Sequence, residues 1–139
     1  MTSEQLSALQ QYVNTVKDLM GLKDWTIEVR DKALDDPDII AQVKHTEGRK
    51  FARVYVGEKW REQDAEGKRA AIVHELVHCQ YASATDVIRL DLYQCSSLSQ
   101  QTYDMVWGAY KRQVEYATDA IADVIAPYMP LPEQANDGN

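Results

Sequence analysis

The segment at residues 64–81 constrains the fold of this chain more than any other. It contains no proline, and Asp64 is suited to act as an N-cap. Its apolar residues recur at spacings of three and four: Ala70, Val73, Leu76 and Val77. This period predicts an amphipathic helix. The pentapeptide His74-Glu75-Leu76-Val77-His78 lies inside it, with the two histidines beside the apolar stripe.

The pentapeptide predicts a metal site. Residues four apart in a helix lie one turn apart on the same face, so His74 and His78 can direct ring nitrogens at one ion. Imidazole nitrogens are common zinc ligands, and the pattern HExxH is typical of zinc peptidases. Glu75 lies beside the two ligands and is the candidate general base. The alternative is a helix that carries two surface histidines.

A catalytic zinc site needs a third protein ligand, and the second long helical segment offers one. Residues 103–128 carry apolar and aromatic side chains at helical spacing, which predicts an amphipathic helix. Glu115 and Asp119 lie four apart on its flank, so one can bind the ion while the other orients a ligand. The only other histidine, His45, falls in a strand-like segment, where a hydrogen-bonded or surface role is expected.

HELVH followed on a later helix by Glu-x-x-x-Asp resembles the gluzincin metallopeptidases, the clan of thermolysin. The resemblance implies a zincin-like fold and one catalytic Zn²⁺ bound by His74, His78 and Glu115. It makes Glu75 the general base. It gives Asp119 the place of a carboxylate that accepts a hydrogen bond from the far nitrogen of a ligand histidine.

The length of 139 residues is too short for a thermolysin-like pair of lobes, so the chain is similar to the minimal gluzincins, the minigluzincins. A weaker similarity is to the ImmA/IrrE-type peptidases, which implies an intracellular protein of a phage or other mobile element. The SprT-like peptidases come third, because they usually bring a third histidine. All three imply hydrolysis of a peptide or protein substrate.

The chain departs from the thermolysin pattern in two ways. Gln80 stands where zincin helices commonly carry an apolar residue, and no histidine follows His78. An oxyanion-stabilising group would have to come from elsewhere. The candidates, among which the sequence does not choose, are Tyr103, Tyr110, Tyr116 and Arg112.

The N-terminal half is expected to form the scaffold of an α+β fold. Residues 3–20 predict a helix capped by Ser3, residues 25–30, 39–45 and 51–56 predict strands, and residues 85–95 predict a short helix. We expect a small three-stranded, mainly antiparallel sheet packed on the helices. In zincins a sheet edge can hold an extended substrate, and residues 51–57 are the first candidate for that edge.

Residues 1–129 are expected to form one domain and residues 130–139 a flexible tail. The formal net charge of −7 and the lack of a basic run argue against nucleic-acid or membrane partners. With no signal-like start, the expected compartment is the cytoplasm, where Cys79 and Cys95 would be reduced packing residues. A monomer or weak homodimer is expected. The alternative to an endopeptidase is a non-catalytic, zinc-stabilised binding or regulatory domain with the same fold.

Overall fold

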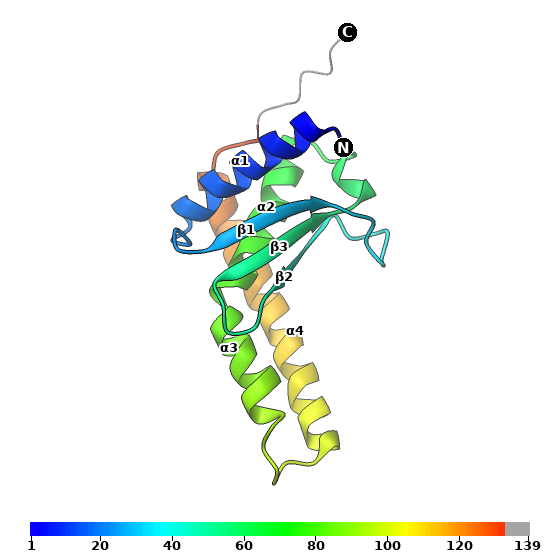
Figure 1. The fold of residues 1–139 in the computed structure, drawn as a ribbon, viewed down its shortest axis with the longest axis vertical. Helices are drawn as coiled ribbons and strands as arrows, with labels where there is room; N and C mark the ends of the chain where they lie inside the picture. The colour runs from blue at the N-terminus through cyan, green and yellow to red at the C-terminus, as the bar shows by residue number, and fades with distance from the viewer. Residues whose placement is uncertain (133–139) are drawn as a thin grey trace.

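The computed structural model describes residues 1–132 and has an α+β architecture, with four α-helices and one three-stranded mixed sheet (Figure 1). The regular elements in chain order are α1 (Ser3–Leu19), β1 (Thr26–Asp31), β2 (Ala41–His45), β3 (Phe51–Val56), α2 (Ala65–Gln80), α3 (Ala82–Asp86) and α4 (Gln100–Ile125). Short 3₁₀ turns lie at Glu58–Trp60 and Ala126–Tyr128, and a π-helical segment, η2, lies at Val87–Leu92.

The helix ends follow their local sequence with one exception. Asp64 caps α2, because its carboxylate accepts the N–H of Gly67 at 2.7 Å. Ser99 caps α4 in the same way. The expected cap of α1, Ser3, is wrong: Thr2 is the N-cap and forms a capping box with Gln5. A capping box satisfies two backbone N–H groups together, which favours the earlier start.

The sheet differs from the expected one in its strand order and direction. The order is β1-β3-β2, with β1 parallel to β3 and β2 antiparallel to β3. The sheet is therefore mixed, not mainly antiparallel. The prediction that residues 51–57 form the edge is also wrong, because β3 lies in the centre. The edge strand beside α2 is β2.

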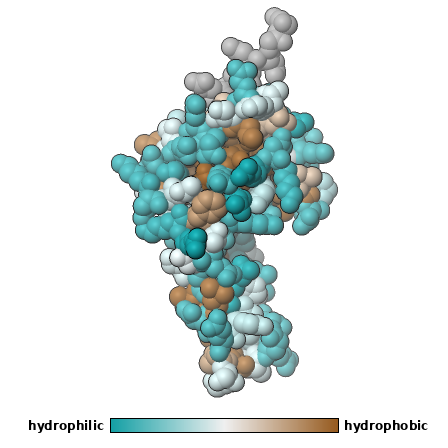
Figure 2. Space-filling view, viewed as in Figure 1, coloured by the Kyte–Doolittle hydropathy of each residue, from teal (hydrophilic) through white to brown (hydrophobic). Residues whose placement is uncertain are grey.

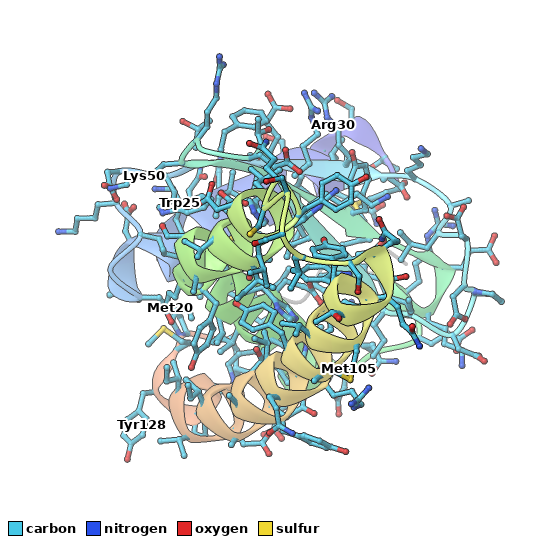
Figure 3. All side chains as sticks on the ribbon, turned by 90° about the horizontal axis from the view of Figure 1, so that it is seen from below. Met20, Trp25, Arg30, Lys50, Met105 and Tyr128 are labelled. Carbon is cyan, nitrogen blue, oxygen red and sulfur yellow. The ribbon has the colours of Figure 1, made fainter. Side chains whose placement is uncertain are left out.

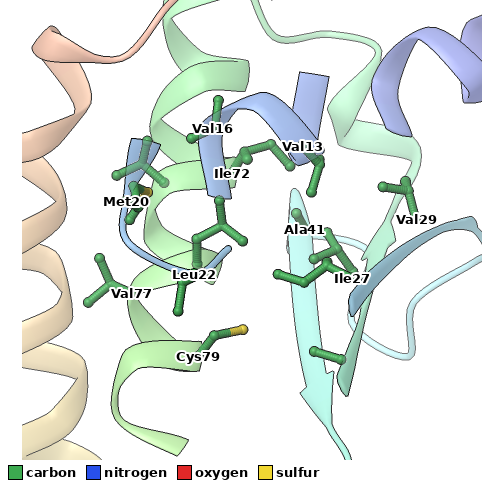
Figure 4. Packing of buried hydrophobic residues seen from close by; sticks show 14 of the residues in the cluster. Val13, Val16, Met20, Leu22, Ile27, Val29, Ala41, Ile72, Val77 and Cys79 are labelled. Atoms are coloured by element: carbon green, nitrogen blue, oxygen red, sulfur yellow. The ribbon is translucent and has the colours of Figure 1, made fainter. Parts of the chain in front are cut away.

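Only one face of the sheet is buried. Alternate residues of the central strand, Ala52, Val54 and Val56, have no exposed surface, whereas Arg53 between them is exposed. This two-residue period is the expected mark of a half-covered sheet. The buried side chains of the strands meet those of α1 and α2 in one core (Figure 4). Its largest fully buried members are Ile72, Leu76, Val13, Val16, Val54, Val56, Val73 and Val77.

The second half of helix α4 packs against α2, and its first half projects well beyond the body (Figure 1). Its first half forms a hairpin with η2, joined by an edge-to-face contact between Tyr93 and Tyr103. No residue between 83 and 117 is buried, so this hairpin contributes little to the core. Figure 2 shows hydrophobic side chains at the surface of this projecting part. Figure 3 shows Met105 near the far end of α4 and Tyr128 just past its other end, and both are exposed.

The C-terminal end of the described chain lies against α1. Pro130 contacts the body, because the Tyr12 hydroxyl donates to its carbonyl oxygen at 2.9 Å. The expectation of a flexible tail falls mostly on residues 133–139, which lie outside the described residues. Among residues 1–132, no helix has the length and apolar character needed to cross a membrane.

Candidate metal centre

The two motif histidines lie on one face of α2 and direct the same ring nitrogen at each other. The Nε2 atoms of His74 and His78 are 3.2 Å apart, and the rings meet edge to face with centroids 5.0 Å apart. The adjacent core residues Leu76 and Val77 are fully buried, which fixes the rotation of α2 about its axis. Both histidines are therefore half-buried at the border between the core and solvent.

Helix α4 brings the two acidic residues of the predicted site to these histidines. One oxygen of Glu115, Oε1, lies 3.1 Å from His78 Nε2, and the other, Oε2, lies 3.5 Å from His74 Nε2. Asp119 Oδ1 lies 3.1 Å from the opposite nitrogen of His74, Nδ1. The four side chains that the sequence analysis assigned to the metal and its surroundings thus meet at one place, across 36 intervening residues between His78 and Glu115.

The three donor groups lie close to the spacing that a tetrahedral zinc ion requires. Ligand atoms about 2.0–2.1 Å from such an ion lie about 3.3 Å from one another. The two Nε2 atoms are 3.2 Å apart, and they lie 3.1 and 3.5 Å from two different oxygens of Glu115. One ligand atom from each of the three residues lies within 4.8 Å of the others, so a small movement of the carboxylate would bring one oxygen to the tetrahedral spacing. Two imidazoles and a carboxylate are also the ligand types that zinc prefers in catalytic sites.

Asp119 is placed to set the tautomer of His74. A carboxylate beside Nδ1 accepts a hydrogen bond from Nδ1–H. The ring proton then stays on Nδ1, and the lone pair stays on Nε2, the nitrogen that faces His78 and Glu115. Burial lowers the pKa of His78, although Glu115 opposes that shift. A neutral imidazole is the form that binds a metal ion. Both effects favour donor nitrogens that are free to coordinate.

Glu75 contacts the sheet and also lines the cavity that adjoins His74. It is 8% exposed, and its Oε2 accepts the backbone N–H of Val43 on β2 at 2.7 Å. Burial raises the pKa of Glu75 to about 8, although the hydrogen bond from Val43 opposes the shift. A carboxyl group with a pKa near neutrality is suited to both accepting and donating a proton.

The raised pKa of Glu75 predicts a pH-dependent stability of the metal-free protein. Between pH 4.5 and 8 the unfolded chain releases the Glu75 proton while the folded protein keeps it, so the free energy of unfolding falls as the pH rises. The fall from pH 5 to pH 9 is expected to reach up to about 5 kcal/mol, at about 1.4 kcal/mol per pKa unit. Urea unfolding with a chelator present, at both pH values, measures it.

The control for this measurement is Glu75→Gln, which removes the titrating group and leaves every other titrating group in place. The difference between wild type and variant isolates Glu75. We expect the variant to gain stability relative to wild type at pH 9 and to differ little at pH 5. Parallel pH dependence in the two proteins would contradict the assignment of a raised pKa.

His45 is hydrogen-bonded, as expected for a lone histidine in a strand. Its Nε2 lies 2.9 Å from Asp86 Oδ1, and the other oxygen of Asp86 accepts the N–H of Gly48 at 3.0 Å. Gly48 has a φ of +67°, a conformation that glycine adopts without strain. These contacts join the turn between β2 and β3 to the end of α3. His45 is not part of the cluster that groups His74, His78 and Glu115.

A cavity of about 360 Å³ adjoins His74 and Glu75. It lies between the start of β2, the first turns of α2 and the second half of α4. Small residues form much of its lining, including Gly67, Ala71 and Ala122. A group bound there would lie beside the candidate base.

The four candidates for oxyanion stabilisation have different surroundings. The Tyr110 hydroxyl lies 3.0 Å from Thr85 Oγ1, and the Tyr103 hydroxyl donates to the carbonyl oxygen of Arg89 at 3.3 Å. The Tyr110 hydroxyl therefore has a partner on α3, and the Tyr103 hydroxyl has one on η2. Tyr116 is 69% exposed and follows Glu115 directly, and Arg112 is also exposed on α4.

The two cysteines differ in environment. Cys79 is buried in the core, as expected, and burial raises the pKa of its thiol to about 12. Cys95 is exposed, so its expected packing role is wrong. It lies after η2 in the connection between the helices of the projecting hairpin, where no core is available.

Sequence reasoning missed the part that β2 plays beside the candidate base. The group that contacts Glu75 is a backbone N–H, which every residue type except proline carries, so no residue type in the sequence could signal it.

Comparisons with protein families, with curated proteins and with solved structures find no match to this chain. A family assignment therefore depends on the residues of the site alone.

Proposed function

We propose that this protein is a zinc-dependent endopeptidase of the gluzincin type, with a zincin-like fold. The observation that carries the proposal is the convergence of His74, His78 and Glu115, whose ligand atoms lie within 4.8 Å of one another, with Glu75 one residue from the first ligand. His74 and His78 would bind the ion through Nε2 and Glu115 through its carboxylate. Bound zinc supplies a Lewis acid that lowers the pKa of a water molecule to about 7 and polarises a carbonyl group.

The remaining steps belong to side chains of this chain. Glu75 accepts the proton of the water that attacks the scissile carbonyl carbon, and it then donates that proton to the leaving amine. Its burial and raised pKa support this double role. Asp119 holds His74 in the tautomer that a metal ligand needs. The adjoining cavity offers space for a substrate side chain beside Glu75.

The test is the recovery of activity with one metal ion. Purified protein is stripped with a chelator, its metal content is measured, and hydrolysis of a quenched fluorescent peptide library is followed as zinc is added back. We expect activity to rise with zinc and to level off at one ion per chain. Binding of one zinc without hydrolysis would favour the non-catalytic, zinc-stabilised domain, and absence of zinc binding would refute both functions.

A further inference from the structure

The candidate base is held by the sheet as well as by its own helix. Glu75 Oε2 accepts a hydrogen bond from the N–H of Val43 at 2.7 Å, at the short end of the range for N–H···O bonds. The interaction joins positions 32 residues apart, on β2 and α2. No hydrogen bond is found for Oε1 within residues 1–132, and Glu75 also lines the cavity beside His74.

The register of the sheet explains why this N–H is available. Thr46 donates to Phe51 and Gly57 donates to Ile40, which identifies these as hydrogen-bonded pairs of the β2 and β3 ladder. Hydrogen-bonded and non-hydrogen-bonded pairs alternate in an antiparallel ladder. Val43, opposite Val54, therefore belongs to a non-hydrogen-bonded pair, and its N–H points away from β3. The free edge of β2 lies beside α2, where it meets Glu75.

We propose that the backbone N–H of Val43 positions the Glu75 carboxylate for proton transfer, with Oε2 fixed on the strand and Oε1 left to exchange the proton. This inference rests on the proposed peptidase function. A glutamate side chain has three rotatable bonds, and fixing one oxygen restricts them together. Misplacement of a catalytic group by about 1 Å can lower a rate by about 100-fold, so the positioning has a measurable effect.

The first test removes the donor without removing the strand. Val43→Pro lacks the N–H, and proline is tolerated on an edge strand where the N–H lies outside the ladder. Val43→Ala is the matched control, because it shortens the same side chain and keeps the N–H. In the zinc-loaded proteins we expect kcat to be about 10- to 100-fold lower for Val43→Pro than for Val43→Ala, with KM and zinc content equal. Equal kcat values for the two variants would overturn the positioning role.

The second test needs no activity and no proline variant. Amide hydrogen exchange, followed by NMR, is compared between wild type and Glu75→Ala. We expect the Val43 amide to be protected in wild type and to lose at least about 10-fold of that protection in the variant, since the acceptor that it has within residues 1–132 is removed. The amides of Ala41 and His45, which point the same way by the two-residue period of the strand, are the internal controls.

The two tests separate this inference from the proposed function. If Val43 exchanges equally in wild type and Glu75→Ala, the hydrogen bond is refuted, whether or not the protein is a peptidase. If the Val43 amide is protected but zinc-loaded wild type hydrolyses no peptide, the proposed function fails and the positioning role fails with it. Peptidase activity with equal kcat in Val43→Pro and Val43→Ala refutes the positioning role alone.

Discussion

Replacement of Glu75 with Gln is expected to leave one zinc ion per chain bound and to lower the rate of peptide hydrolysis by about 10³-fold. Gln has the shape of Glu and can still accept the hydrogen bond of Val43, but it cannot take a proton from water. General base catalysis contributes about 10² to 10⁴ in rate, and the expected loss lies within that range. The fall should appear in kcat, because Glu75 is not among the proposed zinc ligands.

The matched control is Glu66→Gln, the same substitution on the same helix at an exposed position near its start. Zinc content is measured by elemental analysis and hydrolysis by peptide cleavage, with all three proteins prepared together. Wild-type rates are expected for Glu66→Gln. A Glu75→Gln protein that hydrolyses peptides at the wild-type rate would remove Glu75 from the mechanism.

Replacement of His78 or Glu115 with Ala is expected to weaken zinc binding by more than about 100-fold. Each substitution leaves two of the three protein ligands, and even residues that only orient a ligand contribute about 10- to 100-fold to metal affinity. Asp119→Ala should fall within that smaller range, because its carboxylate contacts Nδ1 of His74 and not the donor nitrogen. Competition with a chromogenic chelator measures the three affinities.

Asp123→Ala is the control for the ligand variants. Asp123 is exposed and lies one turn beyond Asp119 on α4, so it has the same charge and a similar place, but within residues 1–132 it forms no ion pair with either histidine. Its zinc affinity should match wild type. Loss of zinc in His78→Ala but full affinity in Glu115→Ala would show that the third ligand is another residue. Unchanged affinity in both variants would show that zinc binds elsewhere.

The helices were predictable because their signals are local. The three- and four-residue spacing of apolar side chains between residues 64 and 81 predicted α2, and Asp64 predicted its start. The pattern of residues 103–128 predicted most of α4, whose actual start at Gln100 follows from its cap at Ser99. A period of 3.6 residues and a capping side chain depend only on neighbours in sequence. The placement of His74 and His78 on one face follows from the same period.

The sheet was only partly predictable. The strands at Ala41–His45 and Phe51–Val56 follow from alternation and from the turn at Gly48, but their order does not. Alternation states which residues face the core and is silent on which strand lies in the middle. The parallel pairing of β1 with β3 joins segments that are not adjacent in the chain, and it places β3 in the centre and β2 at the edge.

The sequence by itself determined the chemistry available at the site: two imidazoles and a carboxylate within one helical turn, and two further carboxylates one turn apart on a later helix. Only the tertiary structure decided that Glu115 reaches both histidines, because packing of α4 on α2 sets the rotation and the shift of one helix along the other. It also decided that Glu75 meets Val43. A backbone N–H exists at every residue except proline, and the strand order leaves this one outside the β2–β3 ladder, at the edge that faces α2.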